Sequence, residues 1–228
     1  MNNSFSCIIP FYNEGLRVLK VVRVISNMNS VSQIICVDDG STDDTGQLLV
    51  KEFPKVILVR LDSNKGKARA IFKGLELAKN KNLLLIDADL GNLKSEELDG
   101  ACNKFVEDQS VDLIIFKIKG NNKFVDELLR KYIFLGGNRI LRKTDLEAVE
   151  KSNPYGYQLE VAINKHMVEN HRKVFWTKCS AFNPHKAKKF SFIEGMKKDL
   201  KMELSIISFL GYLGYLKQMI LFCRKELE

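Results

Sequence analysis

Short runs of hydrophobic residues alternate with amphipathic segments along the first half of the chain. The runs are continuous, as is typical of strands covered on both faces of a sheet, and they occupy residues 5–10, 33–37, 55–59 and 82–86. Between them, hydrophobic residues recur every three or four positions, which predicts helices over residues 15–28, 42–53 and 66–79. Strand–helix alternation of this kind predicts right-handed crossovers and a mostly parallel central sheet flanked by helices.

The second half of the chain is less regular. Its pattern predicts strands over residues 111–118, 139–141 and 173–176, helices over residues 123–132 and 157–168, and mainly helical structure from residue 190. We therefore predict a single Rossmann-like α/β domain over residues 1–203, followed by a C-terminal amphipathic helix over residues 204–228. This tail has three candidate contacts: its own domain, a partner chain and a membrane surface.

The composition is that of a globular protein, with 45% hydrophobic and 28% charged residues, which excludes a disordered chain. Five cysteines are scattered without C-x-x-C spacing, a pattern that favours reduced thiols over a disulfide framework or a zinc site. The hydrophobic run at residues 4–10 is too short for a signal peptide and is followed at once by polar residues. We therefore expect a cytoplasmic protein.

The formal net charge of +8 favours anionic partners such as nucleotide diphosphates or anionic lipid, although a basic surface kept for solubility is the alternative. Residues 184–201 hold six lysines against two carboxylates, and the mostly apolar residues 204–222 are too interrupted for a membrane span of roughly 20 residues. Peripheral contact with the inner face of a membrane and a homodimer both remain open. Nucleic acid is disfavoured, because aromatic residues are not interleaved with the basic ones.

Polar clusters follow three of the predicted strands, and each begins where its strand ends. Residues 12–14 follow the first strand, Asp38 and Asp39 follow the second, and Asp87 and Asp89 follow the fourth. Ligands of open parallel sheets bind outside the carboxyl ends of the strands. We therefore expect these clusters to converge on one edge of the sheet.

Each cluster has a chemical and a purely structural interpretation. Asp38 and Asp39 can accept hydrogen bonds from a base or a ribose hydroxyl, whereas a helix start explains residues 41–44 but not two adjacent carboxylates. Asp87 and Asp89 can hold a hard cation such as Mg²⁺ or Mn²⁺, although a D-x-D sequence also occurs in ordinary turns.

A third helix begins with cations around Gly66, which suits phosphate binding at a helix N-terminus. The spacing is not that of a P-loop, and no G-x-G-x-x-G follows the first strand, so a triphosphatase and a dinucleotide-dependent dehydrogenase are disfavoured.

Four segments together resemble a known family. Ile-Pro-Phe-Tyr-Asn-Glu (9–14), Val-Asp-Asp-Gly-Ser-Thr-Asp (37–43), Asn-Lys-Gly-Lys-Ala (64–68) and Asp-Ala-Asp (87–89) have the order and spacing found in family 2 glycosyltransferases. The chain resembles most the polyprenyl-phosphate sugar synthases and their soluble relatives. The resemblance covers about the first hundred residues and implies a GT-A fold. It also implies metal-dependent, inverting transfer from a UDP- or GDP-sugar to a polyprenyl phosphate or another small phosphorylated or hydroxylated acceptor.

The resemblance also implies roles at matching positions. Donor-binding residues would be Pro10, Tyr12 and Glu14 in the nucleotide pocket, Asp38 and Asp39 at the uridine or guanosine, and Lys67 near the base or phosphates. Asp87 and Asp89 would form the D-x-D site for Mg²⁺ or Mn²⁺, with Asp89 the direct ligand and a catalytic residue.

The second half matches the family more loosely. Residues 136–139 resemble an acceptor-side loop and make Arg139 a catalytic candidate. Residues 155–160 resemble the segment that places an acidic residue near the acceptor, so Glu160 is a candidate general base; an exposed helix carboxylate is the alternative, and an ionised phosphate acceptor needs no base. His185, in a loop after a predicted strand, is a candidate third metal ligand.

Two further functions stay open. A catalytically idle binding module could retain this fold, although the presence of both D-x-D carboxylates argues against it. A sugar nucleotidyltransferase would need a loop rich in glycine and arginine after the first strand, where residues 11–14 are Phe-Tyr-Asn-Glu instead.

Overall fold

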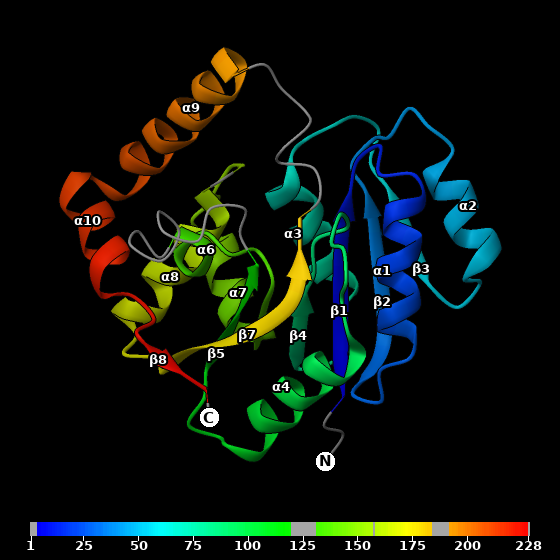
Figure 1. The fold of residues 1–228 in the computed structure, drawn as a ribbon, viewed down its shortest axis with the longest axis horizontal. Helices are drawn as coiled ribbons and strands as arrows, with labels where there is room; N and C mark the ends of the chain where they lie inside the picture. The colour runs from blue at the N-terminus through cyan, green and yellow to red at the C-terminus, as the bar shows by residue number, and fades with distance from the viewer. Residues whose placement is uncertain (1–3, 120–130, 157, 184–191, 228) are drawn as a thin grey trace.

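The protein forms one eight-stranded sheet with helices on both faces (Figure 1). The computed structural model describes residues 4–119, 131–156, 158–183 and 192–227. The strands are β1 (Phe5–Phe11), β2 (Val31–Asp38), β3 (Ile57–Arg60), β4 (Asn82–Leu85), β5 (Leu113–Lys119), β6 (Arg139–Arg142), β7 (Val174–Phe182) and β8 (Lys225–Glu226). The helices are α1 (Leu16–Ser26), α2 (Thr45–Glu52), α3 (Lys67–Leu77), α4 (Ser95–Glu107), α6 (Lys131–Phe134), α7 (Lys143–Glu150), α8 (Gln158–Glu169), α9 (Phe192–Leu210) and α10 (Tyr212–Leu221).

The strand order is β3-β2-β1-β4-β6-β5-β7-β8, and the mostly parallel sheet predicted from the sequence is confirmed. Among the described strands only β6 is antiparallel to its neighbours, β4 and β5. The central strands are buried on both faces, which explains their continuous hydrophobic runs. On β1, for example, Cys7 and Ile9 face a core formed with α1, α2 and α4, whereas Ile8 faces a core formed with α3, α7 and α8.

The predicted elements of the first half are present, and three elements of the described chain, α4, α7 and β8, are not predicted from the sequence. The buried face of α4 is Leu98, Ala101, Cys102 and Phe105, a helical stripe whose small members weaken the pattern. The buried face of α7 includes a carboxylate, Asp145, and β8 is only two residues long. Most of the helix predicted over residues 123–132 lies outside the described residues.

The C-terminal segment is not the single helix expected over residues 204–228. Residue 204 lies inside α9, which ends at Leu210, and Gly211 then turns the chain with a φ of 71°, a conformation that strongly favours glycine. The next helix, α10, leads into β8, which pairs with β7. The division into residues 1–203 and 204–228 stays a prediction.

The tail packs on its own domain along one side. Ile206 is buried against Phe134 and Val161, and the side chain of Gln218 bonds Asn164 and the Val161 carbonyl, at 3.1 Å in both cases. No single helix in the described part of the chain is long and apolar enough to cross a membrane. The segments Met202–Leu210 and Tyr212–Leu221 reach that hydropathy only together, and they are bent by 103°.

Two helix glycines provide a test of how tightly α3 packs on the sheet. A Cβ on Gly74 would lie 2.6 Å from Cγ2 of Ile8 and 3.2 Å from Cγ2 of Val37, whereas a Cβ on Gly100 of α4 would meet nothing within 4 Å. We expect Gly74→Ala to lower the free energy of unfolding by about 1–3 kcal/mol through overpacking. Gly100→Ala should raise it by about 0.5–1 kcal/mol, because alanine is the better helix former.

Urea unfolding of the two variants measures both changes on the same scale. A gain in stability in Gly74→Ala equal to that in Gly100→Ala would contradict the close approach of α3 to β1.

Candidate active site

The polar clusters after β1 and β2 meet at the carboxyl edge of the sheet, as the sequence predicts. The backbone N–H of Asn13 donates to Oγ of Ser41 at 3.0 Å, and the N–H of Thr42 donates to Oδ1 of Asn13 at 2.8 Å. Asn13 has a φ of 53°, in the left-handed region that asparagine tolerates better than most residues. Two loops separated by a whole helix are therefore joined by direct hydrogen bonds.

Both carboxylates after β2 are buried and hold backbone N–H groups. Asp38 accepts a bond from the N–H of Ser41 at 2.7 Å. Asp39 accepts bonds from the N–H groups of Lys65 (2.7 Å) and Gly66 (2.8 Å). Asp39 thereby ties the loop after β2 to the N-terminus of α3. In this structure, the two carboxylates shape the rim of the site.

A surface hollow of about 690 Å³ lies beside these carboxylates and is lined by Gly40, Ser41, Thr42, Arg60, Leu61 and Asp62. Its volume is within the range of small-molecule sites. The guanidinium of Arg60 donates to the Ser41 carbonyl at 2.7 Å, which fixes one wall. Sequence reasoning missed residues 60–62, although the rule on strand ends, applied to β3, could have found them.

Lys67, Asp87 and Glu160 form the centre of the site. Nζ of Lys67 lies 2.6 Å from Oδ1 of Asp87 and 3.0 Å from Oε1 of Glu160. The three side chains come from the start of α3, the loop after β4 and the first turn of α8. All three residues are site candidates from the sequence, where Lys67 is expected at the donor and Glu160 at the acceptor. The contact between the two was not predicted.

The charges around Lys67 determine its protonation. Burial by itself lowers the pKa of Lys67, but the carboxylates of Asp87 and Glu160 more than reverse this, so the pKa is raised above its ordinary value. The ammonium is therefore charged at neutral pH. Its side chain is 32% exposed and that of Glu160 only 10%, so Lys67 lies between the buried Glu160 and open space.

Two residues that the sequence analysis did not single out complete this centre. Asn138 accepts a bond from the Asp87 N–H at 2.8 Å, and its Nδ2 lies 3.3 Å from Oδ2 of the same residue. A Cβ on Gly137 would lie 2.1 Å from Nζ of Lys67, so only glycine leaves room for the ammonium. The sequence feature that could have identified both residues is the Gly-Gly-Asn segment directly before Arg139.

Asp89 lies on the other side of the D-x-D turn. Its Oδ2 accepts a bond from Nδ2 of Asn183 at 2.7 Å, and Gly91 exchanges backbone hydrogen bonds with Phe182 at 2.8 and 3.0 Å. The end of β7 is thus attached to the loop after β4. This contact spans almost a hundred residues of sequence.

The D-x-D turn supplies two carboxylates, the kind of ligand that a hard divalent cation prefers. The described residues contain no group of three or more histidine, cysteine or acidic side chains arranged for a metal. His185, the predicted third ligand, lies outside the described residues. Asp87 and Asp89 therefore offer hard oxygen ligands without an all-protein cage. Mg²⁺ is commonly bound in this way, by one or two carboxylates with phosphate oxygens and water completing its shell.

Arg139 lies beneath this centre rather than in it. Its side chain is completely buried, and it donates to the carbonyls of Gly136 (2.5 Å), Glu160 (3.1 Å) and Phe134 (3.3 Å) and to Oδ1 of Asn164 (2.7 Å). Burial lowers the pKa of Arg139 to about 10, so the guanidinium stays charged at neutral pH. The arrangement is that of a positioning residue, whereas the sequence predicts a catalytic one.

The remaining donor candidates differ in their surroundings. Pro10 is buried inside β1, and Tyr12, just after the strand, is 40% exposed. Glu14, in the loop before α1, forms an ion pair at 2.6 Å with Arg17 in the first turn of that helix. Of these three residues, Tyr12 has the most exposed side chain at this edge.

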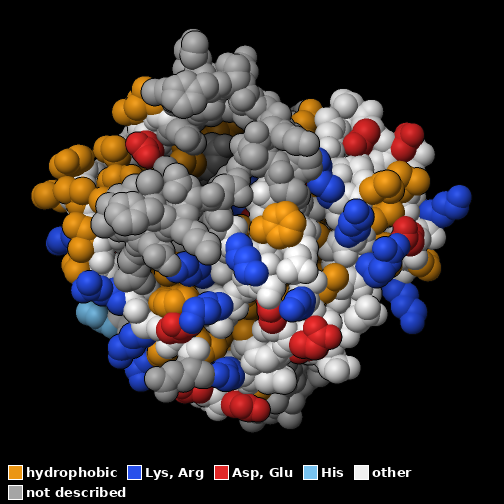
Figure 2. Space-filling model, in the orientation of Figure 1, with side chains coloured by type: hydrophobic (Ala, Val, Ile, Leu, Met, Phe, Trp, Pro, Cys, Tyr) orange, Lys and Arg blue, Asp and Glu red, His pale blue; other side chains and the backbone are white. Residues whose placement is uncertain are grey.

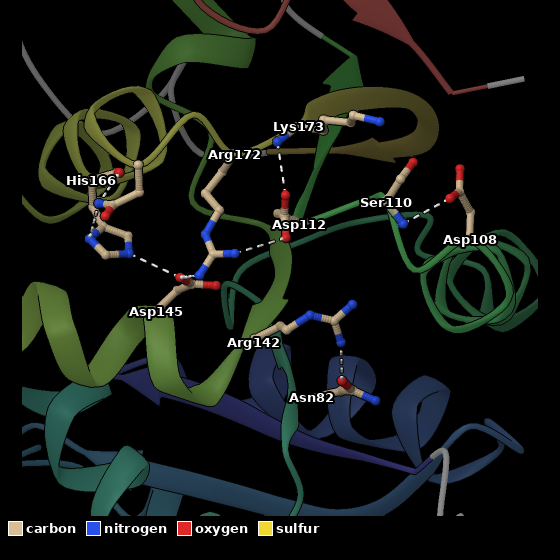
Figure 3. Close-up of polar contacts among 10 residues, drawn as sticks. Asn82, Asp108, Ser110, Asp112, Arg142, Asp145, His166, Arg172 and Lys173 are labelled. Atoms are coloured by element: carbon tan, nitrogen blue, oxygen red, sulfur yellow. Dashed lines mark hydrogen bonds and ion pairs between the residues drawn. The ribbon is translucent and has the colours of Figure 1, made fainter.

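A second polar cluster occupies the opposite edge, at the amino ends of β5 and β7 (Figure 3). Oδ1 of the buried Asp145 lies 3.0 Å from His166 and 3.1 Å from Arg172. Arg172 also pairs with Asp112 at 3.5 Å. These contacts join α7 and α8 to the sheet, so His166 is a structural residue far from the D-x-D turn.

An open, mostly parallel sheet with carboxylates gathered beyond its strand ends is compatible with the GT-A class of glycosyltransferases. The family model described as "Glycosyl transferase family 2" matches residues 6–183. The chain therefore belongs to glycosyl transferase family 2. The resemblance recognised from four motifs in the first hundred residues is confirmed and extends through β7.

Known proteins agree with this assignment. The chain is 29% identical over 135 residues to the dolichyl-phosphate beta-glucosyltransferase of Dictyostelium discoideum, covering 53% of this chain and 38% of that protein. It is 35% identical over 108 residues to the undecaprenyl-phosphate 4-deoxy-4-formamido-L-arabinose transferase of Aeromonas hydrophila, covering 42% and 33%. The chain thus spans about a third to two fifths of the length of these relatives.

A solved structure has the same fold. Glucosyl-3-phosphoglycerate synthase from Mycobacterium tuberculosis, in complex with Mn²⁺, UDP and phosphoglyceric acid, superposes with a TM-score of 0.72. The two chains are 17% identical, and the match covers 91% of this chain and 78% of the other. The GT-A fold expected from the sequence is confirmed.

The burial of Arg139 leads to a stability prediction. Lysine keeps the charge but lacks the planar guanidinium, so it cannot donate to all four acceptors. We therefore expect Arg139→Lys to lower the free energy of unfolding by about 3 kcal/mol. Arg142→Lys on the same strand is the matched control: its guanidinium lies 4.9 Å from the Phe105 ring and 3.3 Å from Asn82. That change should cost about 1 kcal/mol or less. Equal losses on denaturant unfolding would contradict the role given to Arg139.

Proposed function

We propose that the protein transfers a sugar from a nucleoside diphosphate sugar to a phosphorylated acceptor with Mg²⁺ or Mn²⁺. The observation that carries this proposal is the grouping of Asp87, Lys67 and Glu160 at one edge of the sheet, with Asp89 on the same turn as Asp87. In a displacement at an anomeric carbon, the cation that stabilises the charge of the leaving group and the base that activates the acceptor must both lie close to the reacting atoms. Family membership and the GT-A fold support the same reaction class.

The nucleoside would occupy the hollow between residues 40–42 and 60–62. Its walls are held by Arg60 and by the carboxylates of Asp38 and Asp39, and Tyr12 has an exposed ring at the same edge. Lys67 and the backbone N–H groups at the start of α3 suit the diphosphate. The Mycobacterium tuberculosis structure contains UDP, which makes UDP-sugars the first donors to test, with GDP-sugars second.

Asp89, with Asp87 beside it, would hold the divalent cation. When bound, such a cation supplies Lewis-acid stabilisation of the charge that develops on the departing nucleoside diphosphate. Related crystal structures contain Mn²⁺ or Mg²⁺ together with UDP. Asn138 and Asn183 orient the two carboxylates through the bonds described above.

Glu160 would act on the acceptor. Its carboxylate lies at the first turn of α8, where it can take a proton from an acceptor hydroxyl as that oxygen attacks the anomeric carbon. An ionised phosphate acceptor needs no base, and Glu160 then only positions it. Direct displacement of the nucleoside diphosphate inverts the anomeric configuration. The names of the relatives point to polyprenyl phosphates, and the structural match contains phosphoglyceric acid.

Thermal unfolding with UDP, GDP and their glucose or mannose conjugates, with and without Mn²⁺, tests the donor site. At a hundredfold excess over Kd, we expect one base to raise the melting temperature by about 5–10 °C, and Mn²⁺ to enlarge the shift. Asp89→Ala should lose the metal-dependent part. It should also slow transfer, measured as nucleoside diphosphate release with a phosphorylated acceptor, at least about a hundredfold.

Glu76→Ala is the matched control, because Glu76 is an exposed carboxylate on α3 that pairs with Lys73. This variant should respond to donor and metal as the wild type does. Full transfer activity in Asp89→Ala would contradict the metal site. A folded protein that responds to none of the donors would instead favour a catalytically idle binding module.

Exposed hydrophobic side chains on the C-terminal helices support an acceptor at a membrane surface. They gather at the edge of the molecule formed by the end of α9 and by α10 (Figure 2), and they are Leu200, Leu204, Tyr212, Leu213, Ile220 and Leu221. We call these six residues the α9–α10 surface. The ammonium of Lys165 lies 5.9 Å from the Phe209 ring, which brings a cation close to this surface. A net charge of +8 favours anionic lipid.

Vesicle sedimentation tests the α9–α10 surface. Leu213, 74% exposed at the bend, should insert its side chain among lipids, so Leu213→Gln should weaken binding to phosphatidylglycerol vesicles about tenfold. Leu16→Gln is the control, because Leu16 is 66% exposed on the distant α1. Equal effects would contradict the proposal. A dimer that Leu213→Gln disrupts in the absence of vesicles would assign the surface to a second copy of the chain.

A further inference from the structure

The ammonium of Lys67 contacts the carboxylates of Asp87 and Glu160, and each of these carboxylates has a different partner in the proposed reaction. It lies 2.6 Å from Oδ1 of Asp87, a proposed cation ligand, and 3.0 Å from Oε1 of Glu160, the proposed base. In the protein without substrate, one lysine therefore neutralises part of the charge of both groups. Lys67 and Glu160 are 93 residues apart in the sequence.

This ion pair competes with the cation that the site is proposed to bind. An ammonium donates at most three hydrogen bonds, and here two of its contacts are the oxygens of Asp87 and Glu160. A divalent cation bound by Asp87 and the ammonium of Lys67 would repel each other at close range. One of the two must give way, and a lysine side chain can do so, because its four-carbon stem is flexible.

We propose that Lys67 is an internal counter-ion that occupies Asp87 and Glu160 until a donor diphosphate offers it another partner, so that donor and divalent cation bind cooperatively. Departure of the ammonium also releases Glu160 to face the acceptor. This inference rests on the proposed function, because it takes a nucleoside diphosphate as the ligand that draws Lys67 away.

Gly137 provides an independent way to disturb the ion pair. A Cβ at this position would lie 2.1 Å from Nζ of Lys67 and 3.1 Å from each carboxylate oxygen of Asp87. The first distance is far inside van der Waals contact, so the flexible end of Lys67 has to move. Gly137→Ala therefore displaces the ammonium while every charged group of the site is kept.

Cooperativity has a measurable consequence. If the lysine must leave Asp87 before the cation binds, removing it increases affinity for the cation alone and reduces the further gain from the donor. A lysine that served only to bind the diphosphate would have no such effect on the cation alone. A lysine that served only to hold the fold would, when removed, weaken cation binding or stability.

The experiment is a Mn²⁺ titration followed by electron paramagnetic resonance, with and without UDP and, separately, GDP. For the wild type we expect weak binding of Mn²⁺ alone and an affinity at least about fivefold higher with the nucleotide. Lys67→Met and Gly137→Ala should each bind Mn²⁺ alone at least about fivefold more tightly than the wild type, and the nucleotide should add less. Lys73→Met, which removes an exposed cation farther along α3 that pairs with Glu76, should behave as the wild type does.

Two results would overturn the counter-ion role. One is cation binding in Lys67→Met that is unchanged or weaker in a variant with wild-type melting temperature. The other is an equal gain in Mn²⁺ affinity in Lys73→Met, because the effect would then come from net charge alone. In either case, a wild-type protein that still binds UDP or GDP more tightly with Mn²⁺ leaves the proposed function standing. Failure of the wild type to bind any nucleotide would instead remove the proposed function itself.

Discussion

The arrangement of the site depends on one buried charge. Transferring a guanidinium from water into a protein interior costs several kcal/mol unless its donors are satisfied, and Arg139 meets this requirement with three backbone carbonyls and one amide oxygen. Those acceptors belong to the segment before β6 and to α8. Satisfying Arg139 therefore fixes both segments relative to the sheet. Gly137 lies in the first of them and Glu160 in the second, and this is how both come to surround Lys67.

The two carboxylates at the rim of the site, Asp38 and Asp39, have a structural role as well as the binding role proposed for them. Asp38 and Asp39 hold the loops after β2 and β3 through backbone N–H groups, and the hollow lies beside these loops. In the proposed function, a residue of this kind would stabilise the binding site and also form part of it. Asp89 differs, since its bond is to a side chain, Asn183, at the end of β7.

The two ends of the chain contribute to different sides of the molecule. The first four strands, with their loops, form the side proposed for the donor, and they contain the motifs that define the family. The side proposed for the acceptor is built from β6, α8 and the C-terminal helices, and these last helices lie beyond residues 6–183, which the family model matches. The bend at Gly211 leaves large hydrophobic side chains of α9 and α10 exposed while Ile206 and Gln218 pack inward.

The sequence by itself determined the parallel half of the sheet and the convergence of its strand-end carboxylates. Both follow from local patterns: continuous hydrophobic runs mark buried strands, and parallel strands bring Asp38 and Asp87 to the same edge. The sequence also identified the family, because four motifs with the family's order and spacing occur within its first hundred residues. The helix α4 was missed although its stripe is present, because alanine and cysteine give a weak hydrophobic signal.

Only the tertiary structure decided which distant side chains touch. Nothing local to Lys67 reveals that its ammonium reaches Glu160, and nothing local to Asp89 reveals Asn183, because such contacts depend on the path of the chain between them. The same is true of burial: the resemblance of Gly-Gly-Asn-Arg to an acceptor-side loop implies a catalytic arginine, whereas packing under α8 encloses that arginine completely. Local patterns determine which elements form and where they end. Packing across the sheet determines which polar groups are enclosed, and therefore which of them are left to meet a substrate.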